Sequence, residues 1–263
     1  MKVLYSFTSS KLEPFFSLQR KGADQTWRTL VSSGNRSIAV YAKSTNIFCI
    51  FHRASIMFEK LRWGRWGRFF TLTLRILFLP LRWKFPKWKE VNGDLHVNIP
   101  EGLTFLGFKM LAAIDYAVKN HFDYLVLTNL SSYPVCSAVE RFLLKFSPQE
   151  DLYAGKRLPS EINHGISGSF VILSSSTCKK ILVSRRLWDH SSLDDIALMK
   201  ITKRLGVYPL YTTSKTFLSS LEPKNLEEIF NEEILHYKCG PFLENGIRVD
   251  FTPMQKLHNF FQG

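Results

Sequence analysis

The sequence has few cysteines, and no two of them stand at the spacing that metal-binding or redox motifs use. The four cysteines are Cys49, Cys136, Cys178 and Cys239, which are far apart in the chain. This spacing excludes a zinc knuckle and a dense disulfide framework. We therefore expect reduced thiols in a cytoplasmic protein, which could also lie peripherally at the inner face of a membrane.

The chain also lacks a long uninterrupted hydrophobic run, an internal repeat and a low-complexity linker. Its most apolar stretch, residues 69–81, is interrupted by Arg75 and carries Pro80 near its end, which argues against a membrane-spanning helix. Residues 1–7 alternate after one lysine and are interpreted as a first strand instead of a targeting segment. With 45% hydrophobic and 22% charged residues, the composition is typical of a folded protein. We expect a single domain over residues 1–263.

Acidic residues are scarce relative to basic ones. There are 22 Asp and Glu against 35 Lys and Arg, a net charge of +13, which predicts attraction to phosphate-rich partners. The excess is concentrated in residues 60–89, where basic and aromatic side chains alternate and no acidic residue occurs. We interpret this segment as an insertion or lobe of the domain. Its candidate membrane-surface residues are Arg62, Trp63, Arg65, Trp66 and Arg68.

Three interpretations of residues 60–89 stay open. The basic side chains could meet lipid phosphates of an anionic membrane while the aromatic rings enter the headgroup boundary. The rings could instead be half-buried in the core, with the basic groups in solvent. A single-stranded nucleic acid could stack on the rings, but no nucleic-acid-binding motif accompanies them. We therefore do not expect nucleic acid as a partner.

Short apolar runs alternate with amphipathic patterns along the chain. Candidate strands are residues 2–7, 37–41, 122–127, 169–173 and 207–211. Candidate helices are residues 107–120, 134–146 with Pro134 at the start, 174–184, 192–205, and a last helix beginning at 252–253. The alternation predicts an α/β fold with a mostly parallel central sheet flanked by helices, in which ligands bind beyond the carboxyl ends of strands. The polar loop 128–132 follows such an end.

Several short segments carry a resemblance to a known family. They are Asp24-Gln25-Thr26-Trp27, the strand at 122–127, Tyr153-Ala154-Gly155, the segment 164–174, and Leu193-Asp194-Asp195-Ile196-Ala197. In this order they resemble signatures of the fringe-like β-1,3-glycosyltransferases and their bacterial and viral relatives: a Thr-Trp segment, the strand before an Asp-x-Asp motif, a Tyr-x-Gly strand, a Gly-Ser-Gly strand and a Glu-Asp-Val motif. The resemblance covers roughly residues 94–238. It implies a GT-A-like fold and an inverting transfer of a sugar from a nucleotide-sugar donor, expected to be a UDP-sugar, to a hydroxyl of a glycan or glycolipid.

The sequence departs from the family at one important motif. Where the family has Asp-x-Asp, this chain has Asn129-Leu130-Ser131, and hard cations prefer carboxylate oxygens. We expect Mn²⁺ or Mg²⁺ to bind only weakly and together with the nucleotide, with His236 as the candidate protein ligand. Alternatively, lysine or arginine neutralises the donor phosphates, or the enzyme is inactive. An ordinary polar turn and helix cap would also explain the loop.

The resemblance assigns roles to the other candidate residues. Asp195 maps to the general base that takes the proton of the acceptor hydroxyl, although the spacing of Ser192 and Asp195 also fits a helix capping box. The candidate donor-binding residues are Thr128, Asn129, Ser131, Gly165, Ser167, Gly168 and Asp194. The competing hypothesis is a non-catalytic basic module on the same fold that binds an anionic membrane or nucleic acid.

Overall fold

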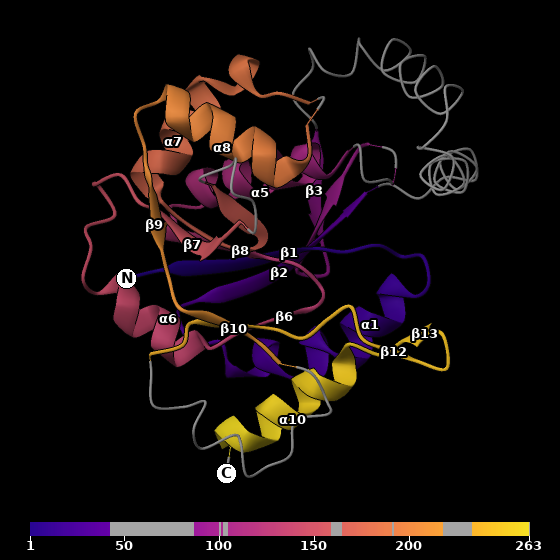
Figure 1. The fold of residues 1–263 in the computed structure, drawn as a ribbon. Helices are drawn as coiled ribbons and strands as arrows, with labels where there is room; N and C mark the ends of the chain where they lie inside the picture. The colour runs from indigo at the N-terminus through magenta and orange to yellow at the C-terminus, as the bar shows by residue number, and fades with distance from the viewer. Residues whose placement is uncertain are drawn as a thin grey trace.

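The protein folds into an α/β structure with helices on both faces of a central sheet (Figure 1). The computed structural model describes residues 1–42, 87–99, 101, 105–158, 165–190, 192–217 and 233–262. Helices α5 (Leu106–Lys119), α7 (Ser175–Val183) and α8 (Asp194–Arg204) cover one face. On the other side lie α1 (Phe15–Lys21), α6 (Cys136–Leu143) and α10 (Phe251–Gln262). The predicted fold class is confirmed.

The central sheet has eight strands in the described residues, in the order β3-β4-β2-β1-β5-β8-β7-β9. Their bounds in this order are Trp88–Val91, Asp94–Val97, Arg36–Ala42, Val3–Thr8, Tyr124–Thr128, Ile166–Ser174, Tyr153–Arg157 and Pro209–Tyr211. Strands β3 and β8 are antiparallel to their neighbours, and the other pairs are parallel. The strand order reverses between β1 and β5, which makes this the switch point where such sheets bind ligands.

The reversed strand β8 has a consequence for the ligand-binding edge. Thr128 at the end of β5 pairs with Phe170, and Arg157 at the end of β7 pairs with Ile166. The first residues of β8 therefore lie at the edge where β5 and β7 end.

Smaller elements border the same edge. Strands β6 (Ser132–Pro134), β11 (His236–Lys238) and β10 (Ser214–Thr216) form a second sheet. A hairpin follows from β12 (Leu243–Glu244) and β13 (Ile247–Arg248). Three short 3-10 helices cover Ala23–Gln25, Trp27–Leu30 and Arg185–Leu187.

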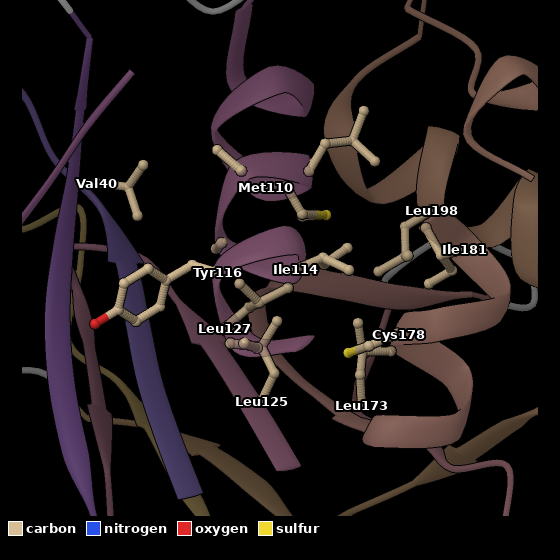
Figure 2. Packing of buried hydrophobic residues seen from close by; sticks show 14 of the residues in the cluster. Val40, Met110, Ile114, Tyr116, Leu125, Leu127, Leu173, Cys178, Ile181 and Leu198 are labelled. Carbon is tan, nitrogen blue, oxygen red and sulfur yellow. The ribbon is translucent and has the colours of Figure 1, made fainter. Parts of the chain in front are cut away.

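Side chains alternate along the strands, so the sheet contributes to two hydrophobic cores. In the first core, Ile114 of α5 packs between Leu127 of the sheet and the helix residues Ile181 and Leu198 (Figure 2). Nearly every turn of α5 is buried, which stabilises a helix that has no capping side chain. The second core holds the alternate residues of β1, and Trp27 packs edge-on against Phe7 with ring centroids 5.6 Å apart.

The predicted strands and helices all occur, but some boundaries differ. The helix predicted to open at Pro134 begins at Cys136, because Pro134 belongs to β6 and lies opposite His236 of β11. The last predicted strand begins at Pro209 instead of Val207. Trp88 and Lys89, at the end of the expected insertion, lie in β3.

Some predictions fall outside the described part of the chain. The candidate membrane-surface residues Arg62, Trp63, Arg65, Trp66 and Arg68 all do. Within the described ranges, no helix combines the length and the apolar character needed to cross a membrane. Cys136, Cys178 and Cys239 are free, buried thiols.

Candidate functional site

Two consecutive residues of β8 join the two candidate motifs at the carboxyl edge of the sheet. The backbone N–H of Gly168 donates to Oδ2 of Asp195 at 3.4 Å. The carbonyl oxygen of Ser169 lies 2.8 Å from Oγ of Ser132 in the loop after β5. The structure thus brings the acidic start of α8 and the loop that replaces Asp-x-Asp to one strand.

The side chain of Asn129 organises that loop. Its Oδ1 accepts a hydrogen bond from the backbone N–H of Ser131 at 3.2 Å and lies 2.8 Å from Oγ of Ser132. Its third contact comes from far along the chain, because Nζ of Lys238 donates to Asn129 Oδ1 at 3.1 Å and to Ser131 Oγ at 2.5 Å. An ammonium group therefore lies against both side chains that stand where the family has carboxylates.

Strand pairing puts Lys238 in this position. Strand β11 is antiparallel to β6, with Lys238 opposite Ser132. Burial lowers the pKa of Lys238 to about 8, and the nearby cation Arg248 lowers it further while Asp250 acts in the opposite direction. The side chain therefore stays mostly protonated at pH 7.

His236, the candidate metal ligand, is fully buried two residues before Lys238. Its ring stacks on Phe170 with centroids 4.8 Å apart and planes 5° apart. Neither ring nitrogen has a hydrogen-bond partner in the described part of the protein. Burial, together with the charges of Lys156 and Lys238, holds the pKa of His236 well below its ordinary value. The imidazole is therefore neutral at physiological pH.

The described residues contain no group of three or more His, Cys, Asp or Glu side chains that could hold a metal ion. A metal role for His236 stays a prediction.

The acidic pair begins helix α8. Leu193 precedes the helix without a capping side chain, and Oγ of Ser192 instead donates to Asp189 at 2.7 Å. The capping-box alternative is therefore wrong. Oδ1 of Asp195 accepts from the N–H of Ile196 at 2.8 Å, so backbone groups hold both of its oxygens. Burial, and secondarily the charge of Asp195, raises the pKa of Asp194 to about 6.

The remaining candidates lie at the same edge in different surroundings. Oγ1 of Thr128 is buried without a hydrogen-bond partner in the described chain, and the hydroxyl of Ser167 lies 3.1 Å from that of Ser169. At Gly165 a Cβ would meet Sδ of Met199 at 2.9 Å, so close packing on α8 requires glycine there. At Gly168 a Cβ would lie 3.5 Å from its nearest neighbours, an ordinary contact.

Lys156 and Lys238 were missed by sequence reasoning. The ammonium of Lys156 is partly buried at the end of β7 and has no hydrogen bond or ion pair within the described residues. It lies near enough to Lys238 and His236 to lower their pKa values. Arg248 is nearby but binds Asp250, with its Nε 2.8 Å from Oδ2. No sequence motif distinguishes these lysines from the other basic residues.

Neither a protein-family model nor a curated protein matches the sequence. Two solved structures show weak similarity. The apo form of mouse xyloside xylosyltransferase 1 is 11% identical with a TM-score of 0.41, over 90% of this chain and 97% of that one. The galactosyltransferase LgtC, in complex with donor and acceptor sugar analogues, is 9% identical with a TM-score of 0.45, over 99% of this chain and 96% of that one. Similarity at this level assigns no family, and the fringe-like relationship stays a prediction.

Proposed function

We propose that the protein is a glycosyltransferase that moves a sugar from a UDP-sugar to a hydroxyl group of a glycan or glycolipid. The observation that carries this proposal is the convergence of segments that resemble the family's signatures. They are far apart in the sequence, yet the loop at Asn129, the start of β8 and the acidic pair of α8 are joined by hydrogen bonds at the carboxyl edge of the sheet. Ligands bind at this edge in open α/β sheets.

Asp195 is the proposed general base. The N–H groups of Gly168 and Ile196 hold one carboxylate oxygen each, and each oxygen keeps a lone pair for a proton. As the acceptor oxygen bonds to the anomeric carbon and the bond to the diphosphate breaks, the hydroxyl proton passes to Asp195. Attack from the side opposite the diphosphate inverts the configuration at that carbon.

The donor groups proposed to bind around this base are polar and mostly neutral. Thr128, Asn129, Ser131 and Ser167 offer hydroxyl and amide groups, and β8 offers its backbone beside Asp195. Asp194, with its raised pKa, is protonated in part of the population near pH 6 and can then donate a hydrogen bond to a sugar hydroxyl.

The test compares Asp195→Asn with the unaltered protein. Transfer is measured as UDP release from a panel of UDP-sugars with glycan and glycolipid acceptors, and UDP affinity is measured by calorimetry. The variant should lose about 100-fold or more in kcat, because loss of a general base typically reduces the rate by about 10²–10⁴. Its UDP affinity should stay the same, because an amide keeps the shape of the carboxyl group.

Asp189→Asn is the matched control, since Asp189 precedes the same helix but binds Lys200 and Ser192. It should retain transfer. Full activity of Asp195→Asn would show that the base lies elsewhere. UDP binding without transfer to any acceptor in the panel would favour the non-catalytic module.

A further inference from the structure

The divalent cation implied by the family resemblance does not fit the loop after β5. Its two candidate ligands from that loop, Asn129 Oδ1 and Ser131 Oγ, are neutral and both contact the ammonium of Lys238. A cation placed between them would meet a like charge at close range, without a carboxylate from the loop to offset it.

We infer that the ammonium of Lys238 takes the place of this cation, and that Lys238 and Lys156 together form a metal-independent binding site for the donor's diphosphate. The inference rests on the proposed function, because it assigns the charge partner of the same donor.

Lys238 has the geometry for this role. Its ammonium carries three N–H donors, of which Asn129 and Ser131 use two. The third is free for a phosphate oxygen. Because the β11–β6 pairing and these two hydrogen bonds fix the side chain, little ordering is needed when the ligand arrives.

Lys156 supplies the second charge. A partly buried ammonium without a partner is unfavourable, and within the described residues Lys156 has none. A phosphate oxygen would give it one. The nearby carboxylate of Asp250 is bound by Arg248 and by the N–H of Phe242, so it is not available to pair with Lys156. Two lysines together match the charge of a divalent cation.

The experiment titrates the metal-free protein with UDP, inorganic pyrophosphate and uridine by calorimetry in EDTA, and repeats the titrations with Mn²⁺. UDP and pyrophosphate should bind in EDTA, and Mn²⁺ should change the Kd of UDP by less than about 2-fold. Lys156→Met and Lys238→Met should each weaken UDP binding by about 10-fold, since a hydrogen bond to a charged group contributes about 1.5–3 kcal/mol. Uridine affinity should not change.

Two further variants guard against structural damage. Lys238→Arg keeps a cation at the loop and should bind UDP without metal better than Lys238→Met. Lys200→Met removes a lysine that is paired with Asp189 on α8, and it should leave UDP binding unchanged. Equal UDP affinity in Lys156→Met, Lys238→Met and the unaltered protein would overturn the inference.

Restoring the acidic motif tests the same placement. With Lys238 present, Asn129→Asp and Ser131→Asp should pair with its ammonium and yield little Mn²⁺ dependence. Adding Lys238→Ser should release the two carboxylates and make UDP binding depend on Mn²⁺. A triple variant that binds UDP equally well with and without Mn²⁺ would contradict the placement of the loop beside the diphosphate.

The inference and the proposed function fail in different ways. Binding of UDP to the unaltered protein only with Mn²⁺ would refute the inference but leave the transferase intact. If the unaltered protein binds neither UDP nor uridine under either condition, the proposed donor is wrong and both fall.

Discussion

The acidic pair at the start of α8 gives a stability prediction with a defined dependence on pH. Asp194 has a pKa of about 6 in the folded protein, against an ordinary value of 3.8. Folding therefore disfavours its charged form, so its ionisation destabilises the protein as the pH rises through this window. Asp194→Asn removes the charge and should stabilise the protein at neutral pH.

The magnitude follows from the pKa difference. At 1.36 kcal/mol for each pH unit, the charged form of Asp194 destabilises the folded state by about 3 kcal/mol at pH 7.5, an upper value for a partly buried side chain. At pH 4 the folded protein carries Asp194 protonated, and the gain from the substitution falls to about 0.5 kcal/mol. For a chain of this size, the gain at pH 7.5 corresponds to a rise in Tm of about 5 °C or more.

The assay is thermal denaturation of both proteins at pH 4 and pH 7.5. Asp151→Asn is a control of opposite sign, because the hydrogen bond from Lys180 lowers the pKa of Asp151. That variant should be less stable than the unaltered protein at pH 7.5, and the loss should shrink as the pH falls. A Tm gain for Asp194→Asn that is equal at both pH values would refute the electrostatic reasoning.

Two other predictions concern the core and the basic segment. Ile114→Ala should destabilise the protein by about 2–5 kcal/mol in chemical denaturation, because the side chain is fully buried between the sheet and α7; Val183→Ala, at an 83% exposed position, should change stability by less than about 0.5 kcal/mol. Replacing Arg62, Arg65 and Arg68 by serine should release the protein from anionic vesicles in a sedimentation assay, and binding by the unaltered protein should weaken with salt. Undiminished vesicle binding by the serine variant would remove the membrane interpretation.

The sequence predicted those elements whose local pattern and tertiary environment agree. Helix α5 has apolar residues on its buried faces, and β5 is an uninterrupted apolar run in the middle of the sheet. Pro134 misled the prediction, because proline fits the first turn of a helix as well as a short strand. Which of the two forms is decided by β11, about a hundred residues later.

Two hairpins were missed although the sequence signals them. Asn92-Gly93 joins β3 to β4, and Asn245-Gly246 joins β12 to β13. All four residues have positive φ angles, as expected for Asn-Gly in two-residue hairpin turns. The first hairpin was hidden because its strand β3 was assigned in part to the basic insertion.

The candidate site was predictable only where the chemistry is local. The segments around Asn129 and Asp195 could be found by their resemblance to a family. The contact between Asn129 and Lys238 depends on strand pairing across 109 positions, and a single lysine in a chain with 35 basic residues carries no signal of its own.

The pairing of β11 with β6 also bears on the order in which the protein becomes competent to bind. All eight strands of the central sheet lie before residue 212, whereas Lys238 follows them in the chain. During synthesis the amino-terminal part of a chain emerges first, and contacts between distant residues form late because loop closure opposes them. The large sheet can therefore assemble while Asn129 still lacks its ammonium partner. A nascent chain would have its core before its anion site, and would not retain nucleotide until the last strands had docked.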